Sequence, residues 1–275
     1  MDAFRDKVAV VTGGASGIGR ALAEELARNG ARVVVSDVNG EGARQVAQSI
    51  GRIGAASVAT VDVTDAAAVE NVIRETAATH GRLDYLFNNA GIAIMGDTRF
   101  MTLADWNKLI DVNLRGVVHG VAAAYPIMVK QRSGHIVNTA SFAGLTPNPG
   151  FTGYAMTKHA VVGLSTSLRG EAAQFGVRVS ALCPGVIDTP IKDAAQLLGG
   201  ADRKTVVEGF PLKMYPASDC ARDALRGVVR NRPIIVVTAP AKLGWYVYRL
   251  APRAWIRIAQ SFVRRNPLFE ASRRG

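Results

Sequence analysis

The chain has 275 residues, 48% of them hydrophobic, and a formal net charge of +11 at pH 7. This length suits one large domain or two small ones, and the composition excludes a disordered chain. Two cysteines, Cys183 and Cys220, are too few for a disulfide framework, and we expect reduced, buried thiols in a cytoplasmic protein. The charged start, Met1–Lys7, predicts no signal peptide, and no run reaches the roughly 18 consecutive apolar residues of a spanning helix.

The positive charge is concentrated at one end. Residues 241–275 contain eight Lys or Arg against one acid, Glu270, so this segment carries most of the excess charge. We therefore divide the chain into a main domain, residues 1–240, and a basic amphipathic extension, residues 241–275. The extension contains no recognisable nucleic-acid motif, so no nucleic-acid partner is expected.

Short apolar runs alternate with helical patterns through the first 240 residues. The runs expected as strands are 7–12, 32–36, 55–63, 83–88, 135–139, 177–182 and 233–237, and the first helices are expected at 21–29 and 66–80. Apolar residues on both faces of such runs indicate strands that are covered on both sides. The alternation predicts an α/β fold: a single-domain, Rossmann-type, doubly wound parallel sheet with helices on both faces.

A glycine-rich turn, Thr12–Gly19, joins the first strand to the first helix. Glycines there permit positive φ and close approach of the backbone to a ligand. The free N–H groups at the start of the helix suit a pyrophosphate. The residues expected to bind a dinucleotide are Gly13, Ser16, Gly17, Ile18 and Gly19.

An acid, Asp37, closes the second strand, 18 residues beyond Gly19. A carboxylate at this position accepts hydrogen bonds from ribose hydroxyls and repels a 2′-phosphate. The turn has no Lys or Arg before Gly17, and Arg20 is interpreted as a solvated helix residue. The pattern favours NAD over NADP, with a strand-end cap as the alternative role of Asp37.

A tyrosine and a lysine, Tyr154 and Lys158, are spaced to share one face of a helix. Free tyrosine titrates near pH 10, so positive charge from Lys158 and from an oxidised nicotinamide is expected to favour its phenolate as a general acid/base. Ser141 precedes Tyr154 by 13 residues, just after a strand, where its hydroxyl can bind the substrate oxygen. The alternatives are a solvated Tyr–Lys pair and a loop-capping serine.

Together these motifs resemble the short-chain dehydrogenase/reductase family over roughly residues 5–240. The resemblance implies that Asp62 and Val63 meet the adenine and that Asn89, Ala90 and Gly91 form the fourth-strand motif. It also implies that Asn113 holds a relay water, so that Asn113, Ser141, Tyr154 and Lys158 form the catalytic set. A further loop is implied to hold the nicotinamide through Pro184, Gly185, Ile187 and Thr189. Members of the family are dimers or tetramers, which implies a homodimer or homotetramer.

The sequence therefore predicts an NAD-dependent oxidoreductase that moves a hydride between nicotinamide and a hydrophobic secondary alcohol or ketone. The alternatives are a non-catalytic NAD-binding regulator and an NADP-dependent carbonyl or 3-oxoacyl reductase. Four histidines have no metal-binding spacing, so no metal is expected. The apolar residues expected to cover the substrate are Ile92, Ile94, Met95, Phe142, Leu197, Leu198, Val206, Val207, Phe210, Leu212, Met214 and Tyr215.

The extension interleaves aromatic and aliphatic residues with arginines, and Pro252 is expected to divide it into two helices. On a helical wheel Trp255, Ile258, Ala259 and Phe262 fall on one side. Two alternatives stay open: packing within the protein or its oligomer, and peripheral contact with a membrane surface. The expected location is cytoplasmic, with or without that peripheral contact.

Overall fold

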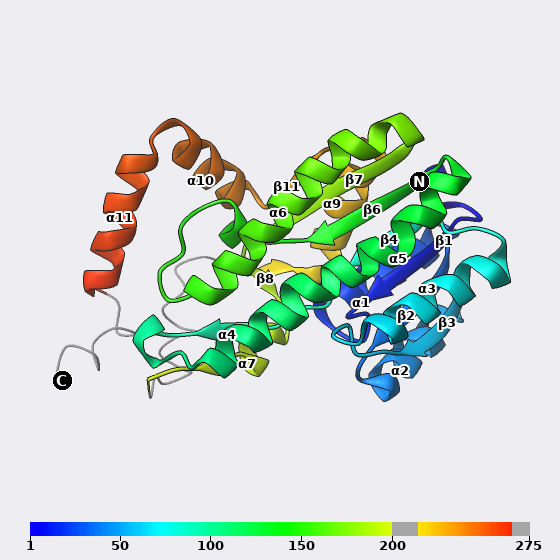
Figure 1. Ribbon diagram of the computed structural model, residues 1–275, viewed down its shortest axis with the longest axis horizontal. Helices are drawn as coiled ribbons and strands as arrows, with labels where there is room; N and C mark the ends of the chain where they lie inside the picture. Colours follow the sequence, from blue (N-terminus) through cyan, green and yellow to red (C-terminus); the bar gives the residue numbers. More distant parts are fainter. Residues whose placement is uncertain (200–213, 266–275) are drawn as a thin grey trace.

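A seven-stranded sheet forms the centre of the computed structural model, which describes residues 1–199 and 214–265 (Figure 1). Its strand order is β11-β7-β6-β4-β1-β2-β3, and every neighbouring pair is parallel. The strands are β1 (Val8–Thr12), β2 (Arg32–Asp37), β3 (Ala55–Thr60), β4 (Tyr85–Asn88), β6 (Gly134–Thr139), β7 (Val177–Pro184) and β11 (Ile234–Val237). The predicted doubly wound, Rossmann-type fold is confirmed.

Helices cover both faces of the sheet, which gives the fold three layers. The helices packed on one face are α1 (Gly17–Arg28), α2 (Gly40–Ile50) and α9 (Ala217–Val229). Those on the other face are α3 (Ala66–His80), α5 (Gly116–Gln131) and α6 (Thr152–Ala172). Successive strand residues point to opposite faces, so Leu86 and Phe87 of β4 are both fully buried but belong to different core clusters.

The observed boundaries depart from the prediction in a few places. α1 begins at Gly17 rather than residue 21, because its first turn lies inside the glycine-rich segment. β3 ends at Thr60, and its side chains are half-buried or exposed because it is the last strand of the sheet. The expectation that every strand is buried on both faces is therefore wrong for β3.

Short elements extend beyond the carboxyl ends of the main strands. Two small parallel pairs form: β5 (Ile94–Met95) with β9 (Gln196–Leu197), and β8 (Ile187–Asp188) with β10 (Tyr215–Pro216). The remaining short elements are α7 (Ile191–Ala194) and the 3-10 turns η1 (Asp2–Phe4), η2 (Thr98–Phe100), η4 (Phe142–Gly144) and η5 (Ala173–Phe175). These segments bring residues 92–95 and 187–198 over one edge of the sheet.

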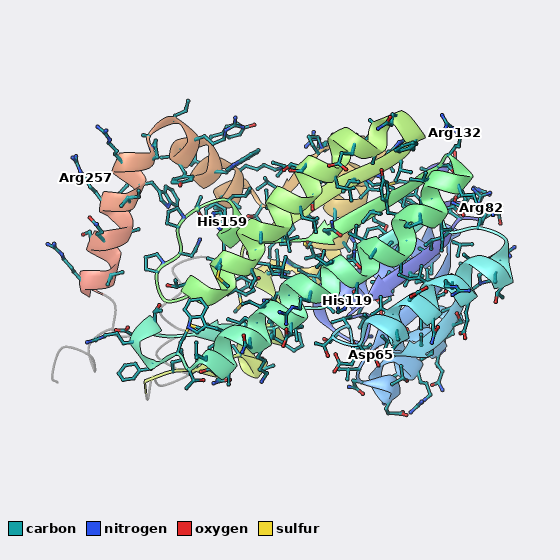
Figure 2. All side chains as sticks on the ribbon, viewed as in Figure 1. Asp65, Arg82, His119, Arg132, His159 and Arg257 are labelled. Atoms are coloured by element: carbon teal, nitrogen blue, oxygen red, sulfur yellow. The ribbon has the colours of Figure 1, made fainter. Side chains whose placement is uncertain are left out.

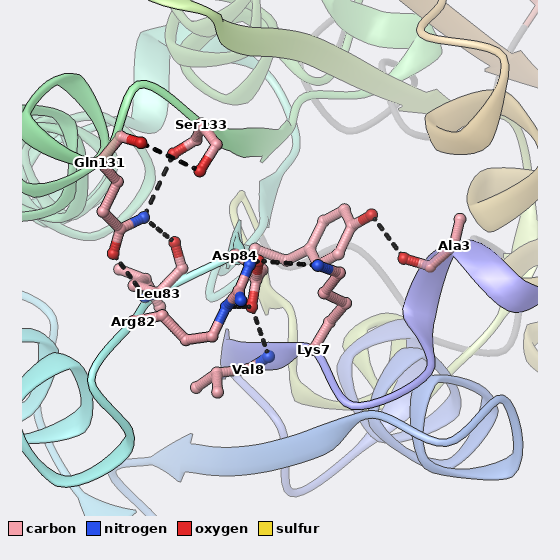
Figure 3. Close-up of polar contacts among 9 residues, drawn as sticks. Ala3, Lys7, Val8, Arg82, Leu83, Asp84, Gln131 and Ser133 are labelled. Carbon is pink, nitrogen blue, oxygen red and sulfur yellow. Dashed lines mark hydrogen bonds and ion pairs between the residues drawn. The ribbon is translucent and has the colours of Figure 1, made fainter.

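The opposite, amino-terminal edge is held by one buried carboxylate (Figure 3). Asp84 accepts hydrogen bonds from the backbone N–H of Val8 at 2.9 Å and from Nε and Nη2 of Arg82 at 2.7 and 2.5 Å. The Lys7 ammonium lies 3.7 Å from the same carboxylate. Asp84 thereby ties the start of β1 to the segment before β4, far from the carboxyl ends of the strands.

A long, nearly continuous helical stretch runs through α4 (Leu103–Ile110), the π-helical turn η3 (Asp111–Arg115) and α5. By length and composition alone, Leu103–Gln131 could cross a membrane. The sequence criterion of consecutive apolar residues does not detect this segment, because polar residues interrupt it. In the fold this stretch packs against α3, β6 and α6.

The extension forms two helices, α10 (Ala239–Leu250) and α11 (Pro252–Arg265). The break at Pro252 is as predicted. Figure 1 shows this hairpin at the end of the molecule remote from β2 and β3.

Candidate active site

One cavity of about 550 Å³ lies at the carboxyl ends of β1, β2, β4, β6 and β7. All the predicted site residues except Gly19 and Asn113 line it: Gly13, Ser16, Gly17, Ile18, Asp37, Asp62, Val63, Asn89, Ala90, Gly91, Ser141, Tyr154, Lys158, Pro184, Gly185, Ile187 and Thr189. A smaller hollow of about 380 Å³ beside α3 and β3 contains none of them. The structure therefore brings the two groups of motifs, nucleotide and chemical, into one continuous space.

The glycine turn forms a cradle that side chains would fill. Gly13 and Gly17 have φ of +64° and +52°. A Cβ on Gly19 would lie 2.0 Å from the carbonyl oxygen of Gly13. Ser16, the residue before α1, makes no side-chain cap hydrogen bond to the helix. The open N-terminus of α1 next to this bare turn fits the pyrophosphate of a dinucleotide.

The carboxylate of Asp37 is held by two backbone N–H groups. One oxygen accepts from Ala15 in the glycine turn and the other from Asn39, each at 2.9 Å. Through these bonds Asp37 caps the end of the second strand, as the alternative interpretation proposed. They also fix its carboxylate on the wall of the cavity. Arg20 pairs with Glu24 at 2.8 Å and its side chain is 54% exposed, as expected for a solvated helix residue.

Asn89 joins the ends of three strands. Its side-chain nitrogen donates to the Thr12 carbonyl at 3.2 Å, and its side-chain oxygen accepts from the Thr139 hydroxyl at 3.2 Å. The Thr12 hydroxyl accepts from the N–H groups of Asn89 and Ala90 at 3.0 and 3.1 Å. Thr12 was not singled out from the sequence, although its place between the apolar strand and Gly13 was a usable signal.

Tyr154 lies in the first turn of α6, and both Tyr154 and Ser141 line the cavity. Burial raises the pKa of Tyr154, and the hydrogen bond with the Ser141 side chain opposes that shift without cancelling it. The expectation that Lys158 and an oxidised nicotinamide together favour the phenolate stays a prediction. Ser141 also accepts from the Ala143 N–H at 3.1 Å, so it caps η4 as the alternative proposed.

Lys158 is buried behind the tyrosine, with 3% of its surface exposed. Its ammonium donates to the Thr139 carbonyl at 2.8 Å and lies 5.6 Å from the centre of the Tyr154 ring. Burial lowers its pKa to about 8. Burial also raises the pKa of the neighbouring Cys183 thiol to about 12, so Cys183 stays protonated and neutral.

Asn113 lies in the π-helical turn η3 rather than in a regular helix. Its fully buried side chain accepts from the Ile92 N–H at 2.8 Å and donates to the Ile92 carbonyl at 3.0 Å and the Thr157 hydroxyl at 3.2 Å. A Cβ on Gly91 would lie 3.1 Å from the Asn113 side-chain oxygen and 3.4 Å from the Lys158 nitrogen. Glycine at position 91 thus allows Asn113 and Lys158 to approach from either side.

The loop after β7 crosses towards the glycine turn. A Cβ on Gly17 would lie 3.2 Å from the Thr189 side chain, so the two segments face each other across the cavity. Gly185 packs against Thr238, whose hydroxyl would be 2.5 Å from a Cβ at Gly185. This loop therefore forms one wall of the cavity.

Asp62 and Val63, the residues expected to meet the adenine, also line the cavity. Asp62 is exposed and accepts from the N–H and hydroxyl of Thr64 at 2.9 and 2.8 Å. Val63 is buried, and its carbonyl contacts the His119 ring at 2.9 Å. The cavity residues that sequence reasoning missed here are Val38 and Val61, each a direct neighbour of a predicted residue.

The apolar wall differs from the prediction. Ile92 lines the cavity, but Ile94 and Met95 are buried in separate clusters with Leu198 and Ala195. Phe142 instead packs edge-on against Trp255 of α11, at 6.1 Å between ring centres. Wall residues that were missed are Val112, Thr139, Ala140, Pro190 and Ala194. Four expected lid residues lie outside the described residues: Val206, Val207, Phe210 and Leu212.

Residues 7–197 match the model of the short chain dehydrogenase family. Levodione reductase from Leifsonia aquatica is 39% identical over 221 residues, which cover 77% of this chain and 83% of that protein. Oxidoreductase UcpA from Escherichia coli K12 is 37% identical over 195 residues, covering 70% and 74%.

Solved structures agree over most of the chain. A short chain dehydrogenase/reductase from Burkholderia phymatum, in complex with NAD, superposes with a TM-score of 0.83 at 30% identity, covering 92% of this chain and 96% of that one. The crystal structure of levodione reductase gives 0.77 at 32% identity, covering 85% and 96%.

Proposed function

The chain belongs to the short-chain dehydrogenase/reductase family of oxidoreductases, whose members bind a nicotinamide cofactor, and from that membership we propose an NAD-dependent enzyme that interconverts a hydrophobic secondary alcohol and its ketone. The observation that carries the proposal is the single cavity shared by the glycine turn, Asp37, Ser141, Tyr154 and Lys158. We also expect a homodimer or homotetramer in the cytoplasm.

The preference for NAD rests on Asp37. Its carboxylate is fixed by Ala15 and Asn39, so it cannot swing away from the ribose position without losing two hydrogen bonds. A 2′-phosphate there would meet this negative charge. Arg20, the nearest cation after the turn, is engaged with Glu24. The similar structure from Burkholderia phymatum, which holds NAD, is consistent with this preference.

The protein's own residues move the proton. A nicotinamide bound in this cavity would supply the hydride acceptor for oxidation of the alcohol and the hydride donor for reduction of the ketone. The Tyr154 hydroxyl gives its proton to the substrate oxygen during reduction and takes it back during oxidation. Ser141 donates a hydrogen bond to the same oxygen and steadies the charge that develops there.

Lys158 and the positive charge of the oxidised cofactor act together on Tyr154. Burial raises the pKa of Tyr154, so the oxidation direction needs nearby positive charge to release the phenol proton. The ammonium of Lys158, 5.6 Å from the tyrosine ring, supplies the protein's share of that charge. Asn113 positions Ile92 and the first turns of α6 around this pair, and we propose that the backbone of η3 holds the relay water.

The substrate class follows from the walls. The lining of the cavity includes the apolar side chains of Ile92, Val112, Ile187, Ile191 and Ala194. Such walls favour a hydrophobic substrate with one polar oxygen that reaches Ser141 and Tyr154.

The test compares NADH formation from NAD with NADPH formation from NADP, over a panel of hydrophobic secondary alcohols at mildly alkaline pH. We expect turnover with NAD and its loss in Tyr154→Phe, which keeps the ring and removes the proton. Turnover with NADP alone would overturn the cofactor assignment and favour the carbonyl or 3-oxoacyl reductase. NAD binding without turnover of any alcohol or ketone would favour the non-catalytic regulator.

A further inference from the structure

Helix α10 presents two apolar faces, and only one of them packs on the body. Ala241 and Gly244 are buried against the sheet domain, and Tyr248 is half-buried beside them. The opposite side carries an apolar ridge of Leu243, Tyr246, Val247 and Leu250, which are 67%, 57%, 37% and 85% exposed. Their i, i+3, i+4, i+7 spacing aligns them along one side of the helix.

The ridge is held in a fixed direction by packing on the other side of the hairpin. A Cβ on Gly244 would lie 2.8 Å from the Phe142 ring and 3.0 Å from the Trp255 ring, so α10 and α11 meet the body at close contact. Trp255 packs edge-on against both Phe142 and Tyr248, at 6.1 and 6.4 Å between ring centres. The ridge therefore faces away from the domain as part of the folded structure.

Positive charges border the ridge and have no acidic partner nearby. Lys242 and Arg249 flank it on α10, and Arg253 and Arg257 are exposed on α11, where Figure 2 shows Arg257 pointing away from the body. None of the four takes part in an ion pair with any residue in the described part of the chain. The sequence contains no Asp or Glu from residue 224 to residue 269.

The arginines of α1, α2 and α3 behave differently. Arg28 pairs with Glu24, Arg44 with Glu41 and Arg74 with Glu70, each within one turn of the same helix. The four cations of the hairpin thus lack the acidic partner that Arg28, Arg44 and Arg74 have. Whatever covers the ridge must supply both an apolar environment and negative charge.

We propose that the α10–α11 hairpin docks on an anionic lipid surface through the ridge and its basic border. Aliphatic side chains enter the interface while arginines and lysines bind the headgroups, an arrangement typical of interfacial helices. Tyr246 adds an amphipathic ring that favours this depth. A second copy of the chain is a poorer occupant, because its own hairpin is equally basic and would repel the first.

Vesicle flotation of the full-length protein tests the ridge without reference to enzymatic activity. The vesicles are phosphatidylcholine alone or mixed with phosphatidylglycerol. We expect binding to the mixed vesicles only, weakened about tenfold or more by the double variant Leu243→Ser/Leu250→Ser. The matched control is Leu103→Ser, which removes a leucine that is 81% exposed on α4 and should leave binding unchanged.

A charge series tests the border. The double variant Arg253→Gln/Arg257→Gln is expected to reduce binding to the mixed vesicles about tenfold, and added salt should have the same effect. Arg44→Gln/Arg74→Gln removes two exposed but paired arginines and serves as the control. Absence of binding to the mixed vesicles, or equal losses in variants and controls, would overturn the proposal. So would dissociation of an oligomer by Leu243→Ser/Leu250→Ser in sedimentation, which would assign the ridge to a second copy.

Discussion

The ammonium of Lys158 donates a 2.8 Å hydrogen bond to the backbone carbonyl of Thr139, the last residue of β6. The sheet, rather than a carboxylate, thus fixes the charge that stands behind Tyr154. Burial is the main cause that lowers the pKa of Lys158, from its usual 10.5 to about 8. The site therefore holds its charge at a cost in stability.

This cost predicts how stability depends on pH in the cofactor-free protein. Below about pH 8 Lys158 is charged in both the folded and the unfolded chain, so the whole cost of burying the charge lowers the stability of the fold. Between pH 8 and 10.5 the unfolded chain binds more protons than the folded one, so stability rises with pH, and above 10.5 the cost is gone. Lys158→Met removes this titration.

We expect the free energy of unfolding of Lys158→Met to exceed that of the wild type by up to roughly 3 kcal/mol at neutral pH. This difference should shrink as the pH approaches 10.5. Urea unfolding of both proteins across this range measures it. A stability difference that does not change with pH would contradict a depressed pKa at Lys158.

Asp37 predicts the choice of cofactor. Asp37→Ser removes the negative charge that a 2′-phosphate would meet, so the ratio of kcat/KM for NAD to that for NADP should fall by at least about tenfold. Glu41→Gln is the matched control, because it removes one exposed charge at the start of α2. An unchanged ratio in Asp37→Ser would show that discrimination lies elsewhere.

The order of the elements was predictable because apolar runs and helical patterns alternate clearly. The α3 boundaries matched at Ala66 and His80, where Asp65 caps the start and Gly81 adopts positive φ at the end. The start of α1 was not predictable, since Gly17 and Gly19 have low helix propensity and their place depends on tertiary contacts, Gly17 with Thr189 and Gly19 with Gly13 and Asn89.

The set of candidate catalytic residues was predictable, but the backbone conformation around Asn113 and the direction of the Tyr154 pKa shift were not. The π-helical turn around Asn113 depends on hydrogen bonds to Ile92, 21 residues away, which no helical period reports. The direction of the Tyr154 pKa shift depends on how deeply the folded chain buries the phenol. The ridge on α10 was missed because both faces of that helix are apolar, and only the fold decides which one is covered.

Two glycines in helices predict opposite effects on stability. A Cβ on Gly19 would lie 2.0 Å from the Gly13 carbonyl oxygen. Gly19→Ala should therefore lower the free energy of unfolding by at least about 3 kcal/mol and weaken dinucleotide binding. A Cβ on Gly170 of α6 would meet nothing within 4 Å, so Gly170→Ala should gain up to about 1 kcal/mol from helix propensity. Chemical denaturation and NADH fluorescence titration measure both. Equal effects of the two variants would show that the close approach at Gly19 does not exist.

Asp84 predicts a stability effect at the edge of the sheet opposite the site. It is 7% exposed and accepts from Val8 and from two nitrogens of Arg82, so Asp84→Asn breaks a buried charged network and should cost about 2 kcal/mol. The control is Asp2→Asn, since the Asp2–Arg5 pair has side chains 93% and 74% exposed and should contribute less than about 1 kcal/mol. Urea unfolding compares the two, and KM for the cofactor should stay unchanged in both because the network lies at the far ends of the strands. A change in KM for the cofactor with Asp84→Asn would mean that the amino-terminal edge and the cofactor cavity are coupled through β1 and β4.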